Sequence, residues 1–347
     1  MNYSKKVGLT TIFVILGVVT LTIIMQTKKD VGLPECKDEL GCIQLSPQQP
    51  IKIGVIQDLS SRAAPFGIDQ LRSFKIALGK NENKLIGHPV ELVTEDSRCL
   101  PEYGIIAARK MTSDPDIVAI LGTTCSNSAM KVMEIVSESG YTMISGANSA
   151  NSLTEEAGKP GDNWYSGFFR TMFSTDNSGA AAADFINSNL KIRKVATIHD
   201  GDIYTKGYVD RFIKRFEKLG GEVVLNTVIN KGEHNMTPVL KAVVATKAEL
   251  VFVPIFNDEA IPLVKQMRKI KQLNEVALMG GNALINDTFV DAVGNAGTGM
   301  FFLSIAPSDR TPELNQLVQD FQDNFGESPQ STLFDFGYDA MNVLIYA

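Results

Sequence analysis

Residues 117–139 read IVAILGTTCSNSAMKVMEIVSES. Ile117–Leu121 is apolar throughout, Gly122–Ser128 is a run of small and mostly polar residues, and Ser128–Ser139 places apolar residues three and four positions apart. This order predicts a fully buried strand, a turn and an amphipathic helix. A strand that is apolar on both faces is typical of a parallel sheet covered by helices, so the stretch predicts an α/β fold.

The same alternation extends in both directions from this stretch. In the first half of the chain we expect strands at Ile51–Gln57, Val90–Glu95 and Tyr141–Ser145, and helices at Asp69–Lys80 and Glu102–Thr112. After the glycine- and asparagine-rich residues 146–167 the pattern restarts. We expect further strands at Val195–His199, Glu222–Val228, Leu250–Ile255, Val276–Met279 and Met300–Ile305, and further helices at Ser178–Asn189, Lys206–Leu219, Pro238–Thr246, Glu259–Gln272, Thr288–Val293, Glu313–Asn324 and Phe334–Tyr346.

Two successive β/α runs predict two doubly wound parallel-sheet lobes joined by a hinge. The length of 347 residues agrees, because it exceeds what one hydrophobic core usually supports. We expect one lobe to comprise residues 51–172 and 304–347, and the other residues 173–303. The hinge is expected near Phe168–Phe173, with a return crossing near Leu303–Ser308.

The composition is that of a globular protein without a nucleic-acid footprint. Hydrophobic residues make up 44% and charged residues 21%, which is too apolar for a disordered chain. The net charge of −6 is mild, and no basic patch with interleaved aromatic residues stands out. We expect no nucleic-acid partner.

The N-terminal residues 1–29 carry an addressing signal. An uncharged run from Val7 to Met25 lies between Lys5–Lys6 and Lys28–Lys29. At about 1.5 Å per residue, it nearly spans a bilayer core of about 30 Å. No small-residue cleavage site precedes Gln26, so an uncleaved anchor helix is favoured over a signal peptide. Either one places the body outside the cytoplasm, behind a polar linker at residues 30–50.

The four cysteines fit an oxidising compartment. Cys36 and Cys42 bracket a short loop in the linker, while Cys99 and Cys125 each follow a predicted strand and could meet at one edge of a sheet. Two disulfides are the favoured interpretation, and buried free thiols are the alternative. A zinc site would need close C-x-x-C pairs, which the sequence lacks, so no metal site is expected.

Ligands of open α/β sheets bind at the carboxyl ends of the strands. The loop Gly122–Ser128 is the most informative of these ends, because it brings Thr124 and Ser126 to a predicted helix N-terminus, where free N–H groups favour an anion. The alternative is that Ser126 or Asn127 only caps the helix. The loop lacks the Lys-Ser/Thr of a phosphate-binding P-loop.

Two further strand ends offer polar or aromatic groups. Ser145–Ser149 supplies small polar residues, and Tyr204 follows the first strand of the second run, where its ring could cover a ligand. The three histidines show no metal-ligand spacing and no nucleophile-elbow serine. We therefore expect no cofactor and no enzymatic activity.

At this point the body resembles the type I periplasmic binding proteins, and among them the branched-chain amino-acid receptors of ABC transporters. The segments that carry the resemblance are IKIGVIQDLS, NKLIGHPVELVTEDSRC, DPDIVAILGTTCSNS, GYTMISGANS, FFRTMFSTDNSGAAAADF, VATIHDGDIYTKG and YDAMNVLIYA. They are spread from Ile51 to Ala347. Relatives continue past this point, so the end at Ala347, within a predicted helix, is expected to reflect a truncation or a fragment.

The resemblance implies roles for individual residues. Cys99 and Cys125 match the family's disulfide. Ser126 matches the residue that holds a ligand carboxylate. Four other positions match as well: Ala147 and Ser149 offer a carbonyl and a hydroxyl, and Phe66 and Tyr204 are aromatic residues that close over the ligand from the two lobes.

One position departs from the family pattern. The acidic residue that pairs with the ligand's α-ammonium is expected where this chain has Asn282. Removing one partner of a buried charge pair costs about 3–5 kcal/mol. Either Asp202 or Asp258 substitutes for the missing acid, or the ligand lacks an ammonium and is an amide, a carboxylate or a hydroxylated acid.

The function implied is that of an extracytoplasmic receptor that captures a small polar ligand between two lobes and delivers it to an ABC permease. A monomer is expected. The alternative is a ligand-sensing ectodomain that signals to a partner protein, and Asn282 also leaves open an inactive remnant. No cytoplasmic signalling segment is present in the sequence, which favours transport.

Overall fold

The computed structural model describes residues 42–156, 158–304 and 311–347. The predicted anchor at residues 1–29, most of the linker at 30–50, and Cys36 lie outside the described residues. So does the segment 305–310, in the predicted return crossing. Within the described part of the chain, every helix is too short or too polar to cross a membrane.

The first sheet has six strands in the order β2-β3-β1-β4-β5-β8. All neighbours are parallel except β2 and β3. The strands are β1 (Ile51–Gln57), β2 (Lys84–Leu85), β3 (His88–Asp96), β4 (Ile117–Gly122), β5 (Met143–Ser145) and β8 (Phe168–Arg170). A small antiparallel pair, β6 (Glu155–Glu156) and β7 (Lys159–Pro160), lies between β5 and β8 in the chain.

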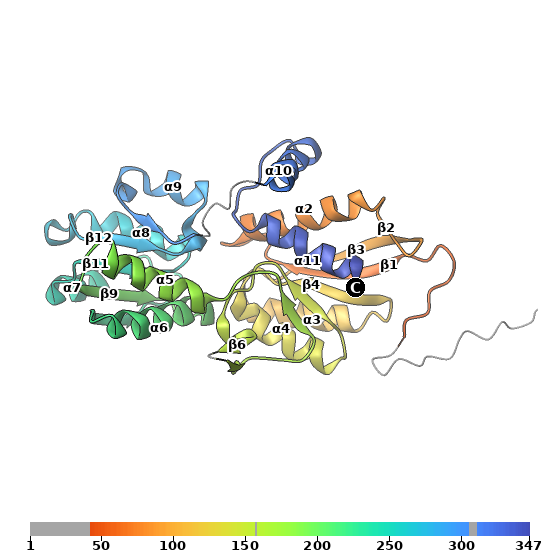
Figure 1. Ribbon diagram of the computed structural model, residues 1–347, viewed down its shortest axis with the longest axis horizontal. Coiled ribbons are helices and arrows are strands. Elements are labelled where there is room, and N and C mark those ends of the chain that lie inside the picture. Colours follow the sequence, from red (N-terminus) through yellow and green to blue (C-terminus); the bar gives the residue numbers. More distant parts are fainter. Residues whose placement is uncertain (1–41, 157, 305–310) are drawn as a thin grey trace, which may run out of the picture. The chain divides into compact units, whose positions relative to one another are not determined.

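Helices cover both faces of this sheet (Figure 1). The helices α3 (Pro101–Thr112) and α4 (Ser126–Glu138) pack together on one face, and α2 (Ala64–Lys80) lies with α11 (Phe334–Tyr346) on the other. The helix α10 (Pro312–Phe325) also contacts α2. Helices α10 and α11 therefore add to the helical layer on this face of the first sheet.

The second sheet has five parallel strands in the order β10-β9-β11-β12-β13. They are β9 (Lys194–His199), β10 (Glu222–Val228), β11 (Leu250–Val253), β12 (Ala277–Gly280) and β13 (Phe301–Phe302). The helices α5 (Thr175–Ser188) and α6 (Ile203–Lys218) pack against each other. The remaining helices are α7 (Thr237–Thr246), α8 (Asn257–Met267) and α9 (Asp287–Val293). The predicted α/β fold with two doubly wound parallel sheets is confirmed.

Both sheets reverse their strand order at one point. In the first sheet β1 lies between β3 and β4, and in the second β9 lies between β10 and β11. At such a switch point the loops on either side lead to opposite faces, which leaves a crevice at the carboxyl ends of the strands. The loops that follow β1, β4, β9 and β11 are therefore the natural places for a ligand site.

Several boundaries differ from those predicted. Helix α2 begins at Ala64 rather than at Asp69, because Pro65 lies in its first turn, where a proline needs no hydrogen-bond partner. Residues 168–170, expected at the hinge, form β8 and pair with β5. The short strands β2, β6 and β7 were not predicted, since a two-residue strand has no periodicity. The lobe boundaries stay a prediction.

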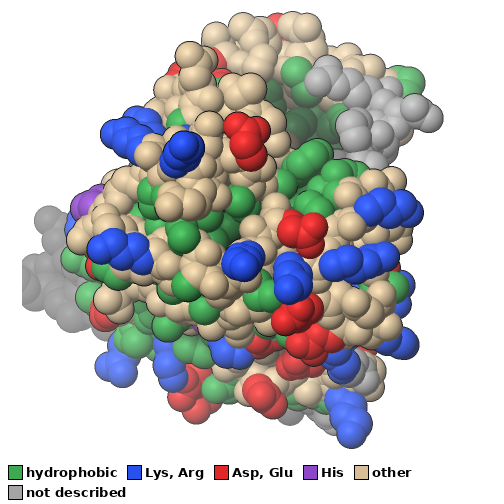
Figure 2. Space-filling model, turned by 90° about the vertical axis from the view of Figure 1, so that its left-hand side faces the viewer, with side chains coloured by type: hydrophobic (Ala, Val, Ile, Leu, Met, Phe, Trp, Pro, Cys, Tyr) green, Lys and Arg blue, Asp and Glu red, His purple; other side chains and the backbone are tan. Residues whose placement is uncertain are grey.

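The predicted disulfide between Cys99 and Cys125 is confirmed, with Cα atoms 5.2 Å apart. It joins the loop after β3 to the residue before α4. The pairing of Cys42 with Cys36 stays a prediction, because Cys36 is not described. On the surface, Figure 2 shows acidic and basic side chains interspersed on the face that it presents, in keeping with the mild net charge.

Candidate ligand-binding site

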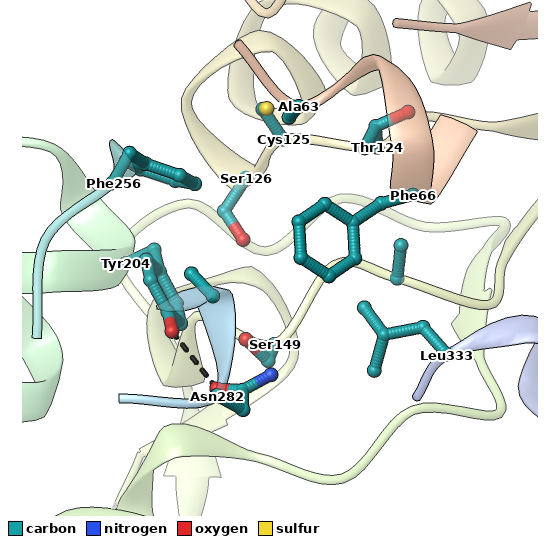
Figure 3. Close-up of a pocket in the computed structure, with 12 residues that line it drawn as sticks. Ala63, Phe66, Thr124, Cys125, Ser126, Ser149, Tyr204, Phe256, Asn282 and Leu333 are labelled. Atoms are coloured by element: carbon teal, nitrogen blue, oxygen red, sulfur yellow. Dashed lines mark hydrogen bonds between the residues drawn. The ribbon is translucent and has the colours of Figure 1, made fainter. Parts of the chain in front are cut away.

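A pocket lies where the switch-point loops of the two sheets converge (Figure 3). The residues that line it are Ala63, Phe66, Thr124, Cys125, Ser126, Ala147, Ser149, Tyr204, Phe256, Asn282, Ala283 and Leu333. All seven predicted ligand-binding residues are among them. The space open to the centre of a water-sized sphere is about 30 Å³, and one water needs about 10–15 Å³. The pocket in this arrangement has room for only a few waters.

Ser126 is the first residue of α4 and is buried. Its side chain does not cap the helix, because the N-cap position belongs to Cys125 and has no side-chain cap bond. Instead the Ser126 hydroxyl oxygen accepts from the Ala150 N–H at 3.2 Å, and Figure 3 shows the oxygen pointing into the cavity. The hydroxyl hydrogen therefore remains for a ligand, beside the free N–H groups of the helix N-terminus.

The loop after β5 adds a second hydroxyl. Ser149 is 4% exposed, and among the described residues no hydrogen bond involves its side chain. Ala147, two residues earlier, donates its N–H to the Ser145 hydroxyl at 3.1 Å. The Ser145 side chain thus shapes this loop, while Ser149 faces the pocket with its hydroxyl unpaired.

Thr124 lines the pocket but does not offer it a hydroxyl. Its oxygen donates to Gln57 Oε1 at 2.6 Å and accepts from the Asp58 N–H at 2.8 Å. Figure 3 shows this oxygen pointing away from the cavity. Thr124 therefore ties the end of β1 to the loop before α4, rather than holding a ligand by its side chain.

Tyr204 and Asn282 form a polar pair on the second-sheet side. The Tyr204 hydroxyl donates to Asn282 Oδ1 at 2.9 Å. The same hydroxyl oxygen accepts from the Ala283 N–H. Since the hydroxyl has one hydrogen, the bond to Asn282 fixes the amide with its oxygen toward Tyr204 and its nitrogen away from it (Figure 3). Burial raises the pKa of Tyr204 well above its usual value, so it stays a neutral donor.

The rest of the lining is apolar. Phe66 from α2, Phe256 after β11 and Leu333 before α11 supply the large side chains. The backbone of Leu333 is held by the buried Gln70, whose amide donates to the Leu333 carbonyl. Sequence reasoning missed Ala63, Cys125, Phe256, Ala283 and Leu333, although Phe256 directly follows the predicted strand Leu250–Ile255.

None of the lining residues is charged. The two candidates for a substitute acid do not change this. Asp202 is buried, but it caps α6 by accepting from the Tyr204 N–H at 3.0 Å and pairs with Lys231 at 2.8 Å. Asp258 is exposed and is not part of the lining. The pocket therefore has no carboxylate to face an ammonium.

A cluster of buried charges lies next to the pocket. We call Asp200, Asp202 and Glu259 the acidic recess; their side chains are at most 1% exposed. Arg62, from the loop after β1, approaches all three at 3.6, 3.9 and 3.8 Å. Burial raises the pKa of Glu259, although the Gly232 N–H and Arg62 favour its ionised form.

A family model described as Periplasmic binding protein matches residues 50–347. This chain belongs to the periplasmic binding protein family. The resemblance inferred from the sequence is thereby confirmed. A related "Amino acid binding protein" from Pseudomonas aeruginosa is 28% identical over 252 residues, covering 72% of this chain and 65% of the relative. The chain thus spans a little under two thirds of that relative's length.

Solved structures show the same fold as this periplasmic binding protein. A leucine-binding protein from Thermotoga maritima has a TM-score of 0.76 and 22% identity, covering 85% of this chain and 82% of that one. An ABC-transporter solute-binding protein from R. palustris, in complex with benzoate, has a TM-score of 0.74 and 22% identity, covering 85% and 79%. At this level of identity, both comparisons show similarity of fold.

Proposed function

We propose that this periplasmic binding protein captures a small carboxylate with an apolar body and no α-ammonium. The observation that carries the proposal is the lining itself, which contains hydroxyls, an amide and apolar side chains but no charged group. A buried ammonium without a carboxylate partner would lose several kcal/mol. A single carboxylate is better served, because a helix N-terminus and two hydroxyls converge on it.

The two ends of the pocket suit the two parts of such a ligand. Ser126 and Ser149 would donate to the carboxylate at the α4 N-terminus. Phe66, Phe256 and Leu333 would enclose the apolar body, as is usual for small-molecule sites. The benzoate in the R. palustris structure is a molecule of this type, whereas the leucine named for the Thermotoga protein carries an ammonium.

The transport role follows from the family. Family membership supports a binding protein outside the cytoplasm that serves an ABC permease, and we propose that residues 1–29 tether it to the membrane. Ligand that contacts both sheets would favour the closed arrangement by a population shift. Signalling to a partner is not favoured, and the monomeric state stays a prediction.

The deciding experiment compares two ligands that differ only in the ammonium. Leucine and 4-methylpentanoate have the same carbon skeleton and carboxylate. Calorimetry on the whole chain, with benzoate as a third probe, should show 4-methylpentanoate or benzoate binding at least tenfold more tightly than leucine, about 1.4 kcal/mol. Tighter binding of leucine would refute the proposal.

A further inference from the structure

Arg62 is an unusual residue for a surface loop. Its side chain is 8% exposed, and its guanidinium lies 4.3 Å from the centre of the Phe256 ring. It comes from the β1–α2 loop beside the first sheet. Phe256 and the acidic recess lie in the segments that follow β9 and β11 of the second sheet. The loop is held in shape by Asp58, which accepts from the N–H groups of Ser61 and Ala63 at 2.9 Å each.

The guanidinium lies directly behind the pocket wall. Ala63, the residue after Arg62, lines the pocket, and so does Phe256, on which Arg62 stacks. On the recess side, Asp202 is two residues from the pocket residue Tyr204 and accepts its N–H. Arg62 therefore adjoins two residues of the pocket wall and also approaches three buried carboxylates.

The recess is short of positive charge even with Arg62 in place. Among the residues that the structure describes, its three carboxylates face two cations, Arg62 and Lys231. Asp200 Oδ2, Glu259 Oε2 and one Arg62 nitrogen are buried without a hydrogen-bond partner. Buried charged atoms without a hydrogen-bond partner are costly, so the recess would accept another cation in place of Arg62.

We propose that Arg62 is a specificity-determining residue that acts as an internal cation. It occupies the recess that would otherwise attract a ligand ammonium, and together with Asn282 it leaves the pocket selective for ligands without one. Arg62 acts through the acidic recess and not by contact with the ligand. The inference rests on the proposed function and names the residue that enforces it.

The test is the ratio of two affinities, leucine over 4-methylpentanoate, measured by calorimetry on the whole chain. Arg62→Met keeps a flexible, unbranched side chain and removes the charge, and should raise this ratio at least tenfold. Arg62→Lys keeps the charge and should leave the ratio near that of the unsubstituted protein. Arg72→Met is the matched control, because Arg72 also pairs with a carboxylate, Glu327, and lies over a phenyl ring, Phe325, away from the pocket.

If Arg62 had a purely structural role, Arg62→Met would weaken the binding of both ligands to the same extent. An unchanged ratio in Arg62→Met, whether or not both affinities fall, would overturn the inference. If Arg62→Met does not fold, Lys231→Met is the second variant, because it removes the other cation of the recess and its side chain is already 30% exposed. Lys231→Met should raise the affinity ratio. An unchanged ratio would again overturn the inference. The proposed function fails separately, if the unsubstituted protein prefers leucine.

Discussion

The amide of Asn282 is the side chain whose orientation bears most directly on the proposed ligand choice. With Oδ1 bound to Tyr204, the free side of the amide is an N–H donor. A donor attracts a ligand oxygen and opposes an ammonium. This side chain therefore works in the same direction as the uncharged lining, and its replacement offers a direct test.

Asn282→Asp should increase the affinity for leucine at least tenfold and leave 4-methylpentanoate unimproved. One carboxylate oxygen would still accept from Tyr204, while the other would face the pocket as a countercharge. Calorimetry with both ligands measures the change. Asn295→Asp adds the same charge at an exposed position just after α9, and it serves as the control. Equal gains in the two variants would show that general charge, not position 282, is responsible.

At the level of single residues, the sequence predicted seven of the residues that line the pocket but not which way their side chains point. Thr124 was correctly placed at a strand end, yet its hydroxyl turns to Gln57 and Asp58, and these partners are 67 and 66 residues away. Arg62 was overlooked because a charged residue in a loop reads as solvent-exposed. Its burial depends on Asp200, Asp202 and Glu259, which the fold alone brings near.

Among the elements, α2 is the one whose position shapes the site most. It begins beside the pocket with Phe66 and packs against α11 along its length. Gly67 allows its first turn to approach the β1 loop, since a Cβ there would lie 2.0 Å from the Asp58 carbonyl oxygen. On the same helix, a Cβ at Gly79 would meet nothing within 4 Å.

This pair of glycines gives a matched test of the packing. Gly67→Ala should lower the free energy of unfolding by about 1–3 kcal/mol and weaken ligand binding, because the Thr124 hydroxyl would also be displaced. Gly79→Ala should raise the free energy of unfolding by up to about 1 kcal/mol through helix propensity. Urea denaturation measures both. A Gly67→Ala protein as stable as Gly79→Ala would contradict the close approach.

The sequence predicted the long elements well and the short ones poorly. Every strand of four or more residues and every helix of ten or more was expected, with ends shifted by up to five residues. Such elements carry enough apolar residues to show a period. The strands β2, β6 and β7 have two residues each, and they exist only because neighbouring segments pair with them.

On the scale of the whole molecule, the charges buried next to the pocket make stability depend on pH. Burial raises the pKa of Glu259 in the folded protein above its unfolded value. The folded state therefore holds this proton more tightly, and the associated stability is lost as the pH rises from the unfolded pKa through the folded one.

Glu259→Gln removes this contribution. The free energy of unfolding of the variant minus that of the unsubstituted protein should be more positive at pH 8 than at pH 5, as measured by urea denaturation. Glu217→Gln, at an exposed position of α6, is the control. A difference that is constant across this range would show that Glu259 ionises in the fold without cost.

The anchoring of α2 has a consequence for how the protein is made. Asp69, Gln70 and Ser73 are buried and take their partners from Ser331, Leu333 and Phe334, more than 260 residues later in the chain. During synthesis these three long-range contacts of α2 cannot form until residues 331–334 have been made, and closing so long a loop is slow. We therefore expect the packing of α2 on the first sheet to be completed late in folding, after these distant segments have met.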